Sequence, residues 1–380
     1  MTSGESEAPE TSSPGDGPPP SPPGVPPILE TKKTSPIQKL VRVTLTLLLV
    51  YLIFGVLIPS FASYEDVWDA LTSLEPAAVL VLTGLTLLVE SCKAGSYALI
   101  IPGLRFGPAF LAQESAAVVS NTVPGPSGTA ARYVTYRKYG ISSEDFGQSY
   151  VVNSAWGNAI PLILPSVGLA LLALQEEIPG NVLTLALIGL AVSAVGIVLA
   201  VMVMRSERFA YRLGERFGRF LNWARGLVRR PPEEEVGKAV VRFRFDVLDT
   251  VRAHWAGLTF LILLREISTY LVLLTSLRAL GAQRVDLTAI EVFAVYTVVR
   301  LATLVEITPG NVGISEALYI AALTWASEGQ DEDVIVAAVF VFRMFTYLGP
   351  ILLGGICSMI LARRFRAQAA TTGPAPSPGA

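Results

Sequence analysis

The stretch from residue 306 to residue 316 decides how this chain folds, because it interrupts a long apolar region with a helix breaker, two glycines and two carboxylates. It reads Glu306-Ile307-Thr308-Pro309-Gly310-Asn311-Val312-Gly313-Ile314-Ser315-Glu316. An earlier segment has the same pattern and reads Asn121-Thr122-Val123-Pro124-Gly125-Pro126-Ser127-Gly128. Both contain Pro-Gly-x-x-Gly between two apolar runs. Together they predict two helical hairpins with a proline and glycines at each tip.

The spacing that follows each segment also matches. Gly140 lies 21 residues before Pro161, and Gly329 lies 21 residues before Pro350. Two copies of one motif, each followed by the same spacing from glycine to proline, indicate that the chain arose by duplication of a single unit.

The composition is that of a membrane protein. Of the 380 residues, 52% are hydrophobic and 16% are charged, whereas soluble domains carry about a quarter charged residues. Apolar segments of membrane-spanning length recur along the chain. We therefore predict an all-α polytopic membrane protein with about six transmembrane helices and two re-entrant helical hairpins. The net charge of -2 gives no indication of nucleic-acid binding.

Six apolar runs are long enough to cross a hydrocarbon core of about 30 Å. Their approximate bounds are 40–61, 76–101, 146–174, 182–204, 255–277 and 334–361. The Pro- and Ser-rich residues 1–36 and the tail 367–380 offer too little apolar surface to fold, so we expect both to be disordered. We expect no cleavable signal peptide, because the first apolar run begins late and is long.

The first predicted hairpin covers residues 108–139, and its arms run from 108 to 121 and from 128 to 139. As helices these arms are about 18 to 21 Å long, which is too short for a full span, so a re-entrant hairpin fits them better. The second hairpin covers residues 287–326. Its first arm is long enough to cross fully, so its depth stays open.

Lysine and arginine are concentrated before the first span, in residues 205–230 and at the end of the last span. The positive-inside rule therefore places both termini in the cytoplasm. Residues 205–230 predict an amphipathic helix on anionic lipids, followed by a second interfacial helix within a cytoplasmic linker, 205–251. The linker separates unit one, 37–204, from unit two, 252–366. In this topology the units are inverted, as in many transporters.

Ionisable residues within the predicted spans and hairpins are functional candidates, because each is costly there unless it is paired or hydrated. They are Glu90, Lys93, Glu114, Arg132, Arg265, Glu266, Glu291, Arg300, Glu306, Glu316 and Arg343. Glu90 and Lys93 share one helical face, so they form either an internal ion pair or part of a substrate site. The same two interpretations apply to Arg265 and Glu266 in unit two.

The Pro-Gly motifs favour binding of an anion. A helix that restarts after a break presents free amide groups and the positive end of its dipole, and a phosphate headgroup is the obvious anion in a membrane. The candidate substrate-binding residues are Asn121, Pro124, Gly125, Gly128, Arg132, Glu306, Pro309, Gly310, Gly313, Glu316 and Arg343. Arg343 either holds a phosphodiester or pairs with Glu306 or Glu316. The alternative is a tight turn that serves helix packing alone.

Other kinds of site find little support. The cysteines, Cys92 and Cys357, fall in different predicted spans, and the one histidine, His254, lies at a membrane interface beside Trp255. A disulfide framework, a zinc site and a catalytic triad all need more than this. We expect no metal, no cofactor and no catalytic residue.

These motifs resemble the membrane domain of the lysylphosphatidylglycerol synthases, a flippase-like family. The resemblance covers about residues 40–362 and rests on 121–128 with Arg132, on Thr308-Pro309-Gly310-x-x-Gly313-x-x-Glu316, and on Gly329 followed by Arg343. Pro126-Ser127 stands where glycines are common in the family. The resemblance implies movement of a lipid with a charged headgroup between leaflets. Some members carry a soluble aminoacyltransferase domain after the membrane part; this chain ends at residue 380, so we expect transport without synthesis. Stand-alone members are linked to polyprenyl-phosphate sugar pathways.

Our leading hypothesis is a translocase of the bacterial inner membrane for a phospholipid or a polyprenyl-phosphate lipid, with the phosphate among the hairpin tips, Arg132 and Arg343. Glu306 and Glu316 then balance these charges or accept a cationic aminoacyl headgroup. One alternative is a secondary transporter of a small solute or ion, with carboxylates as proton carriers. Another is a non-catalytic accessory subunit of a separate membrane glycosyltransferase or synthase.

Overall fold

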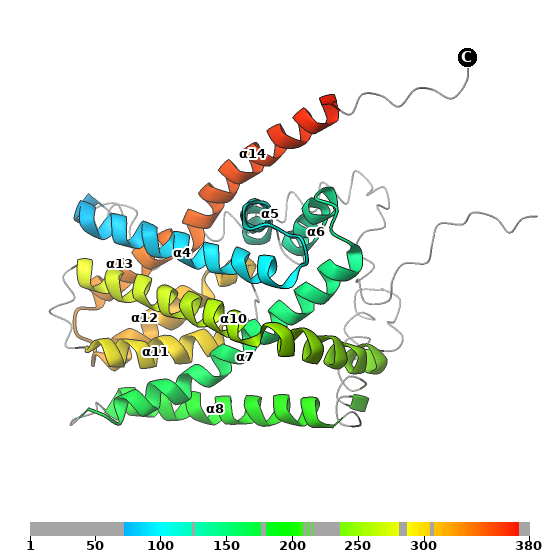
Figure 1. The fold of residues 1–380 in the computed structure, drawn as a ribbon. Helices are drawn as coiled ribbons and strands as arrows, with labels where there is room; N and C mark the ends of the chain where they lie inside the picture. The colour runs from blue at the N-terminus through cyan, green and yellow to red at the C-terminus, as the bar shows by residue number, and fades with distance from the viewer. Residues whose placement is uncertain are drawn as a thin grey trace, which may run out of the picture.

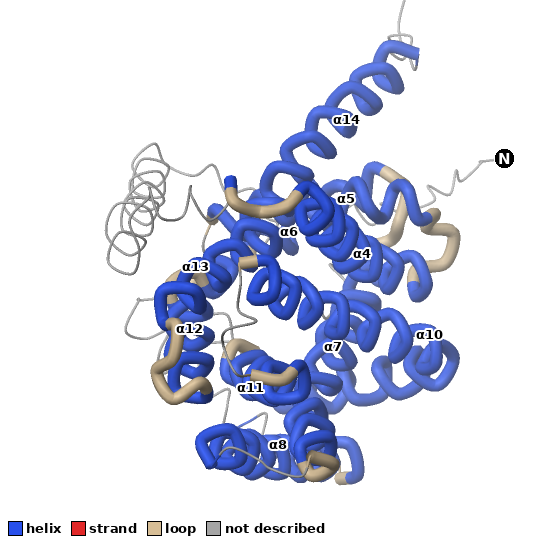
Figure 2. The backbone as a smooth tube through the Cα atoms, turned by 90° about the vertical axis from the view of Figure 1, so that its left-hand side faces the viewer, coloured by secondary structure: helices blue, strands red, loops and turns tan. Residues whose placement is uncertain are grey.

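The computed structural model describes residues 72–123, 126–175, 180–206, 236–280, 287–304 and 308–371, with single positions between 208 and 215. Every regular element in these ranges is a helix (Figure 1, Figure 2). Five helices are long and apolar enough to cross a membrane: Pro76–Ile100, Ser143–Leu172, Gly180–Val198, Ala253–Ala279 and Glu332–Ala367. The predicted all-α polytopic membrane protein is confirmed. The predicted span 40–61 and the tail 1–36 lie outside the described residues.

Unit one contains α4 (Pro76–Ile100), α5 (Phe106–Thr122), α6 (Ser127–Lys138), α7 (Ser143–Leu172) and α8 (Gly180–Arg205). The local sequence explains where these helices begin. A proline starts α4, where its missing N–H breaks no hydrogen bond. The Ser142 side chain caps α7 by accepting a hydrogen bond of 3.0 Å from the Asp145 N–H.

Unit two contains α10 (Val236–Ala279), α11 (Ala289–Ala302), the 3-10 turn η2 (Pro309–Asn311), α12 (Ile314–Ala326), α13 (Glu332–Arg343), the π-helical segment η3 (Met344–Leu348) and α14 (Gly349–Thr371). A reciprocal capping box starts α11. The Glu291 N–H donates to the Thr288 hydroxyl, and the Thr288 N–H donates to the Glu291 carboxylate at 2.7 Å. The intramembrane candidate Glu291 is therefore a helix cap.

The predicted spans 255–277 and 334–361 are confirmed as Ala253–Ala279 and Glu332–Ala367, but the helices that contain them differ in detail from the prediction. The second interfacial helix and the fifth span are one continuous helix of 44 residues, α10; no proline or glycine interrupts residues 238–256. The last span is not a regular helix, because five π-helical residues separate α13 from α14. Pro350 follows them and has no N–H to complete an α-helical ladder. α14 then continues to Thr371, past the start of the predicted tail at 367.

The four hairpin helices are short. They contain 17 residues in α5, 12 in α6, 14 in α11 and 13 in α12. Their lengths of about 18 to 26 Å fall below the hydrocarbon thickness of about 30 Å. The expectation that the first arm of the second hairpin is long enough to cross fully was wrong, because α11 turns out of its helix after Ala302.

The two units run in opposite directions. α4 and α10 pack against each other, and their colour gradients in Figure 1 point to opposite ends of the bundle. The hairpin α5–α6 follows the end of α4, and the hairpin α11–α12 follows the end of α10. The hairpins consequently follow opposite ends of this helix pair, and α5 of the first contacts η2 of the second.

Each hairpin also packs on a late helix of the other unit, α5 on α14 and α11 on α7. A glycine permits each close contact. A Cβ at Gly354 in α14 would collide with the Glu114 carbonyl of α5, and a Cβ at Gly168 in α7 would lie 3.3 Å from Ala294 Cα of α11. This exchange of contacts interlocks the two units.

The matched glycines adopt matching conformations. Gly140 has φ 83 and Gly329 has φ 80, and each turns the chain after its hairpin. Glycine alone adopts this conformation at little cost. The shared geometry supports a common origin of the two units.

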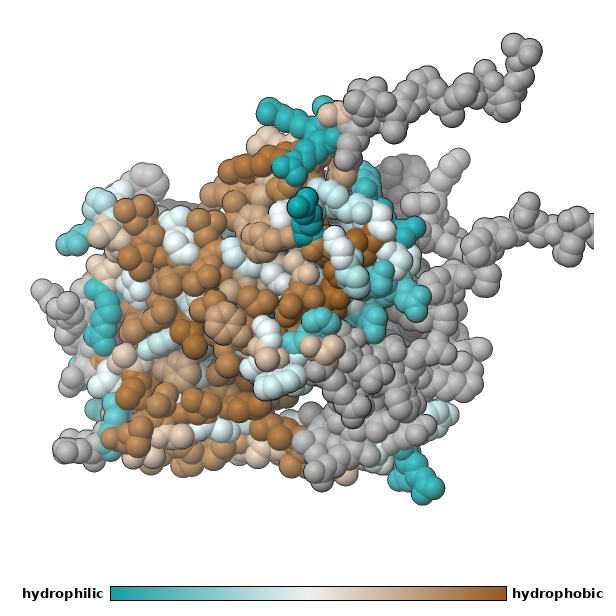
Figure 3. Space-filling model, viewed as in Figure 1, coloured by the Kyte–Doolittle hydropathy of each residue, from teal (hydrophilic) through white to brown (hydrophobic). Residues whose placement is uncertain are grey.

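The surface of the described residues is strongly apolar. Figure 3 shows hydrophobic side chains over most of the bundle, with hydrophilic ones mainly toward its two ends. Among the large apolar side chains that are more than half exposed are Leu80, Val195, Phe260 and Leu352. A soluble protein rarely exposes a continuous apolar surface of this extent, so this surface faces lipid.

Candidate functional site

A polar cavity of about 400 Å³ lies between the two units, and both contribute to its wall. Unit one provides residues of α4, α5, α6 and α7, and unit two provides residues from α10 to the start of α14. The charged residues of the wall are Glu90, Lys93, Arg132, Arg265, Glu266, Arg300 and Arg343. The volume is in the range of ordinary ligand sites.

The end of α5 and the tip of the second hairpin meet at this cavity on one tyrosine of η3. The Tyr347 hydroxyl donates a hydrogen bond of 2.8 Å to the Asn121 carbonyl, in the last turn of α5. A Cβ at Gly310 would lie 2.6 Å from the Tyr347 ring and 3.1 Å from Asn121 Oδ1. Gly310 has φ 58 as well. The glycine of this tip is thus required both for its backbone conformation and for the approach of the ring.

Arg343 ties the second hairpin tip to α12. Its Nε donates to Glu316 Oε1 at 2.7 Å, and its Nη2 donates to the Gly310 carbonyl at 2.8 Å. The two side chains are only 13% and 9% exposed. Of the two carboxylates predicted to pair with Arg343, Glu316 does so, while Glu306 lies outside the described residues.

Glu316 also occupies the start of α12. Its Oε2 accepts a hydrogen bond of 2.7 Å from the Gly313 N–H. This amide is therefore not free for a ligand anion, although free amide groups were expected at the start of the restarted helix. Ser315, in the first turn of α12, does line the cavity.

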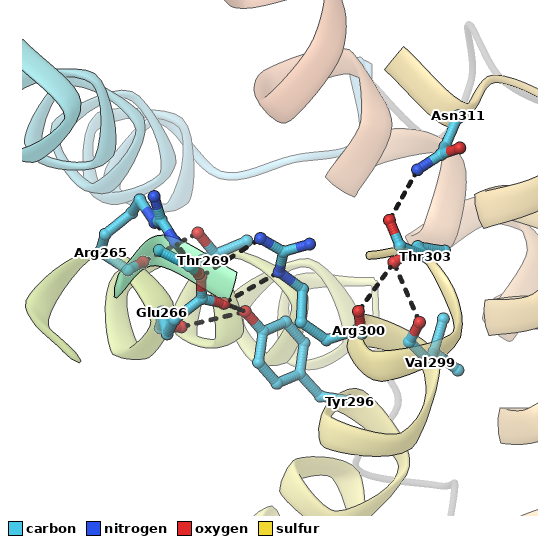
Figure 4. A network of polar contacts seen from close by, with 9 residues as sticks. Arg265, Glu266, Thr269, Tyr296, Val299, Arg300, Thr303 and Asn311 are labelled. Carbon is cyan, nitrogen blue, oxygen red and sulfur yellow. Dashed lines mark hydrogen bonds and ion pairs between the residues drawn. The ribbon is translucent and has the colours of Figure 1, made fainter. Parts of the chain in front are cut away.

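Glu266 is the centre of a buried cluster in unit two (Figure 4). Its carboxylate accepts hydrogen bonds from Arg265 at 2.7 Å, from Arg300 at 3.0 Å and from the Tyr296 hydroxyl at 2.9 Å. Only 2% of Glu266 is exposed, so its charge depends on these donors. Two arginines share one carboxylate, and both line the cavity.

The same cluster is linked to the second hairpin tip. Asn311 Nδ2 donates a hydrogen bond of 2.8 Å to the Thr303 carbonyl, and the Thr303 hydroxyl donates to the Val299 carbonyl at 3.0 Å (Figure 4). These contacts fix the end of α11 against η2, so Arg300 and the tip are held by one polar network.

Unit one contributes two cations with different partners. Lys93 Nζ lies 2.8 Å from Glu90 Oε1, so the internal ion pair forms, and the lysine side chain stays 35% exposed in the cavity wall. Arg132 Nη1 donates to the Tyr97 hydroxyl at 2.8 Å, and its guanidinium carbon lies 4.9 Å from the centre of the Tyr97 ring. Among the described residues, no carboxylate pairs with Arg132.

The cavity brings together most of the candidate site residues. Those in its wall are Glu90, Lys93, Asn121, Arg132, Arg265, Glu266, Arg300, Gly310 and Arg343. Gly128, Gly313 and Glu316 shape the hairpins instead; a Cβ at Gly128 would collide with the Ser120 Cβ of the opposite arm. Pro309 begins η2. Pro124, Gly125 and Glu306 lie outside the described residues.

Several uncharged residues of the wall were missed from the sequence, among them Gln113, Thr269, Thr303 and Tyr347. The sequence gives little indication that these residues line a site, because isolated hydroxyl and amide side chains are common in membrane helices. Tyr347 offered the best clue. It follows Arg343 by four residues and so lies near the same helical face.

Comparison with known families agrees with this architecture. Residues 40–354 match the Lysylphosphatidylglycerol synthase TM region. The chain belongs to this family. The match includes both hairpins and most of the described helices, and it confirms the family suggested by the sequence. No curated protein matches the chain. Membership in the lysylphosphatidylglycerol synthase TM family gives this multi-pass membrane protein a lipid-related function.

Proposed function

We propose that this protein is a lipid translocase of the bacterial inner membrane, which moves a phospholipid or a polyprenyl-phosphate lipid between leaflets. The observation that carries the proposal is the cavity between the units, where Lys93, Arg132, Arg265, Arg300 and Arg343 share one wall. Five cations within an apolar bundle are costly to maintain, so a function that needs them is expected.

The donors of the wall suit a phosphate headgroup. Arginine presents a planar fork of N–H groups that matches phosphate oxygens, and four of the five cations are arginines. Asn121, Asn158 and Thr269 add uncharged hydrogen-bonding groups. A phosphate in the cavity exchanges its hydration for these groups, while the lipid chains stay among the apolar side chains of the surrounding surface.

The inverted hairpins suggest how the site reaches either leaflet. We expect one unit to rock against the other about the cavity, as in other inverted-repeat transporters. In this account both termini are cytoplasmic and the 205–230 linker binds anionic lipids. Translocation breaks no covalent bond, so the protein is not expected to act as an enzyme. A separate synthase or glycosyltransferase is the expected source or user of the lipid.

A second candidate is a proton-driven transporter of a small solute. Its supporting observation is Glu114 of α5, which is fully buried and whose two carboxyl oxygens accept no hydrogen bond from the described residues. A carboxyl group in such a position binds and releases protons with large consequences for the free energy of the protein.

The proposal is tested in liposomes that contain the purified protein and one lipid labelled on its acyl or prenyl chain. A membrane-impermeant reductant bleaches label in the outer leaflet, so transfer from the inner leaflet appears as extra signal loss. Phosphatidylglycerol, phosphatidic acid and polyprenyl phosphate are assayed separately. We expect transfer of at least one of them, and a decrease of at least about tenfold in Arg300→Gln, because charge-assisted contacts to phosphate are strong.

Arg105→Gln is the matched control, because Arg105 is exposed at the start of α5 and does not line the cavity. It should transfer lipid at the rate of the unmodified protein. Absence of transfer for all three lipids, together with proton-dependent uptake of a solute, would contradict the proposal and favour the second candidate.

A further inference from the structure

We infer that the headgroup carried by this protein bears two negative charges on its phosphate part, as a phosphate monoester or a diphosphate does. The inference rests on the proposed function and names the chemical class of its lipid. It follows from the balance of charge around the cavity, counted over the residues that the structure describes, which do not include Glu306.

The cavity wall carries more positive than negative charge. Its cations are Lys93, Arg132, Arg265, Arg300 and Arg343. Three carboxylates pair with them: Glu90 with Lys93, Glu266 with both Arg265 and Arg300, and Glu316 with Arg343. Five cations and three carboxylates leave two positive charges without a counter-charge from the described residues.

The two positive charges without a counter-charge can be assigned to particular residues. One uncompensated charge belongs to Arg132, whose described contacts are the hydroxyl and the ring of Tyr97. Its Nε is buried and has no hydrogen-bond partner among the described residues. The other belongs to the pair Arg265 and Arg300, which share the single carboxylate of Glu266. Both positions line the same cavity.

Glu114 does not cancel this excess. Its side chain is fully buried and does not line the cavity, and neither oxygen accepts a hydrogen bond from a described residue. Glu114 lies beside the Glu90 carboxyl, and two carboxyl groups this close in an apolar interior are expected to carry one negative charge between them, which is already counted for Glu90. We therefore count Glu114 as neutral.

The charge balance of the cavity wall favours one class of lipid headgroup over others. A phosphodiester such as phosphatidylglycerol supplies one negative charge and leaves the other cation uncompensated. A cationic aminoacyl headgroup increases the excess, and Glu316, one of the two carboxylates expected to receive it, already binds Arg343 and Gly313. A monoester or diphosphate compensates both charges, and desolvated charges favour full compensation.

The test compares phosphatidic acid with phosphatidylglycerol in the same liposome assay, with identical labelled chains, at pH 7.5. We expect phosphatidic acid to be transferred at least about tenfold faster, because each uncompensated charge weakens binding strongly. The preference should fall toward unity at pH 5.5, since the second proton of a phosphate monoester binds near about pH 6. Arg132→Gln should also reduce the preference, and Arg105→Gln should leave it unchanged.

The outcomes separate the inference from the proposed function. Transfer of phosphatidylglycerol at an equal or higher rate overturns the inference and leaves the translocase standing, whereas absence of transfer for every lipid refutes the translocase itself. If Arg132→Gln fails to fold, the inference is tested instead by thermal unfolding of the unmodified protein in detergent. Short-chain phosphatidic acid should raise the unfolding temperature more than short-chain phosphatidylglycerol, and an equal shift contradicts the inference.

Discussion

The Tyr347 hydroxyl donates a hydrogen bond of 2.8 Å to the Asn121 carbonyl, although the two residues are 226 positions apart. One turn earlier, Arg343 Nη2 donates to the Gly310 carbonyl at 2.8 Å. The junction of α13 and the π-helical segment thus holds the tips of both hairpins. π-Helical segments occur often at functional sites, and we expect this junction to move when the cavity changes its access.

Loss of the Tyr347 hydroxyl should weaken this junction without removing the ring that packs on Gly310. For Tyr347→Phe we expect a loss of stability of about 0.6 kcal/mol, the usual value for such a bond between membrane helices. Because the contact must open during translocation, the transfer rate should rise about threefold. Tyr270→Phe is the control, since that hydroxyl donates to the Ala289 carbonyl at 2.7 Å outside the cavity. Equal rates in the two variants would contradict this role.

Two adjacent glycines of α14 allow a test of the interlocked packing. A Cβ at Gly354 would collide with the Glu114 carbonyl of α5, whereas a Cβ at Gly355 meets nothing within 4 Å. Gly354→Ala should destabilise the protein by about 1 to 3 kcal/mol through overpacking, while Gly355→Ala should leave its stability unchanged or raise it. The unfolding temperature in detergent measures both. Equal shifts would show that α5 does not lie this close to α14.

The pair formed by Arg343 and Glu316 should behave as one unit. Both side chains are largely buried, so Arg343→Gln leaves the Glu316 carboxylate without its counter-charge and should cost about 3 to 5 kcal/mol. Adding Glu316→Gln removes that isolated charge, so the double variant should be less destabilised than the sum of the single variants. Unfolding free energies in mixed micelles test this, and additive values would mean that the pair is not formed.

The proposed orientation can be measured with single cysteines. Arg105→Cys reports on the turn before the first hairpin, and Gln330→Cys reports on the turn after the second; both positions are exposed, whereas the native cysteines are buried. In intact bacterial cells an impermeant maleimide should label the cysteine at position 330 and spare the one at 105. Labelling of both from outside would exclude inverted units.

The sequence predicted the helices of the described residues and the helix break at Pro309-Gly310 well, because these features depend on local chemistry. Apolar runs define the spans, and proline with glycine breaks a helix wherever it stands. All seven charged residues of the described cavity wall were also predicted, because a charge within an apolar run is conspicuous. The π-helical segment was not predicted, since it depends on how the chain around Pro350 packs rather than on one residue type.

The partners of these charges were harder to predict. Glu90 with Lys93 and Arg265 with Glu266 are close in sequence, so their pairing was one of the two interpretations offered for them. The bond from Arg300 to Glu266 joins residues 34 positions apart, and it depends on how α11 packs beside α10. The spacing of residues along the sequence does not show how these two helices pack. The excess of positive charge was therefore visible only once the helices were placed.

The central claim, that the cavity between the two units holds the lipid phosphate, is tested most directly by photocrosslinking. A lipid phosphate with a photoreactive group next to its phosphorus is irradiated with the protein in liposomes, and the modified residues are mapped by mass spectrometry. The account predicts adducts on cavity residues such as Gln113, Thr269 and Thr303, and their loss in Arg300→Gln. Adducts confined to outward-facing residues such as Phe260 and Leu352 would contradict it.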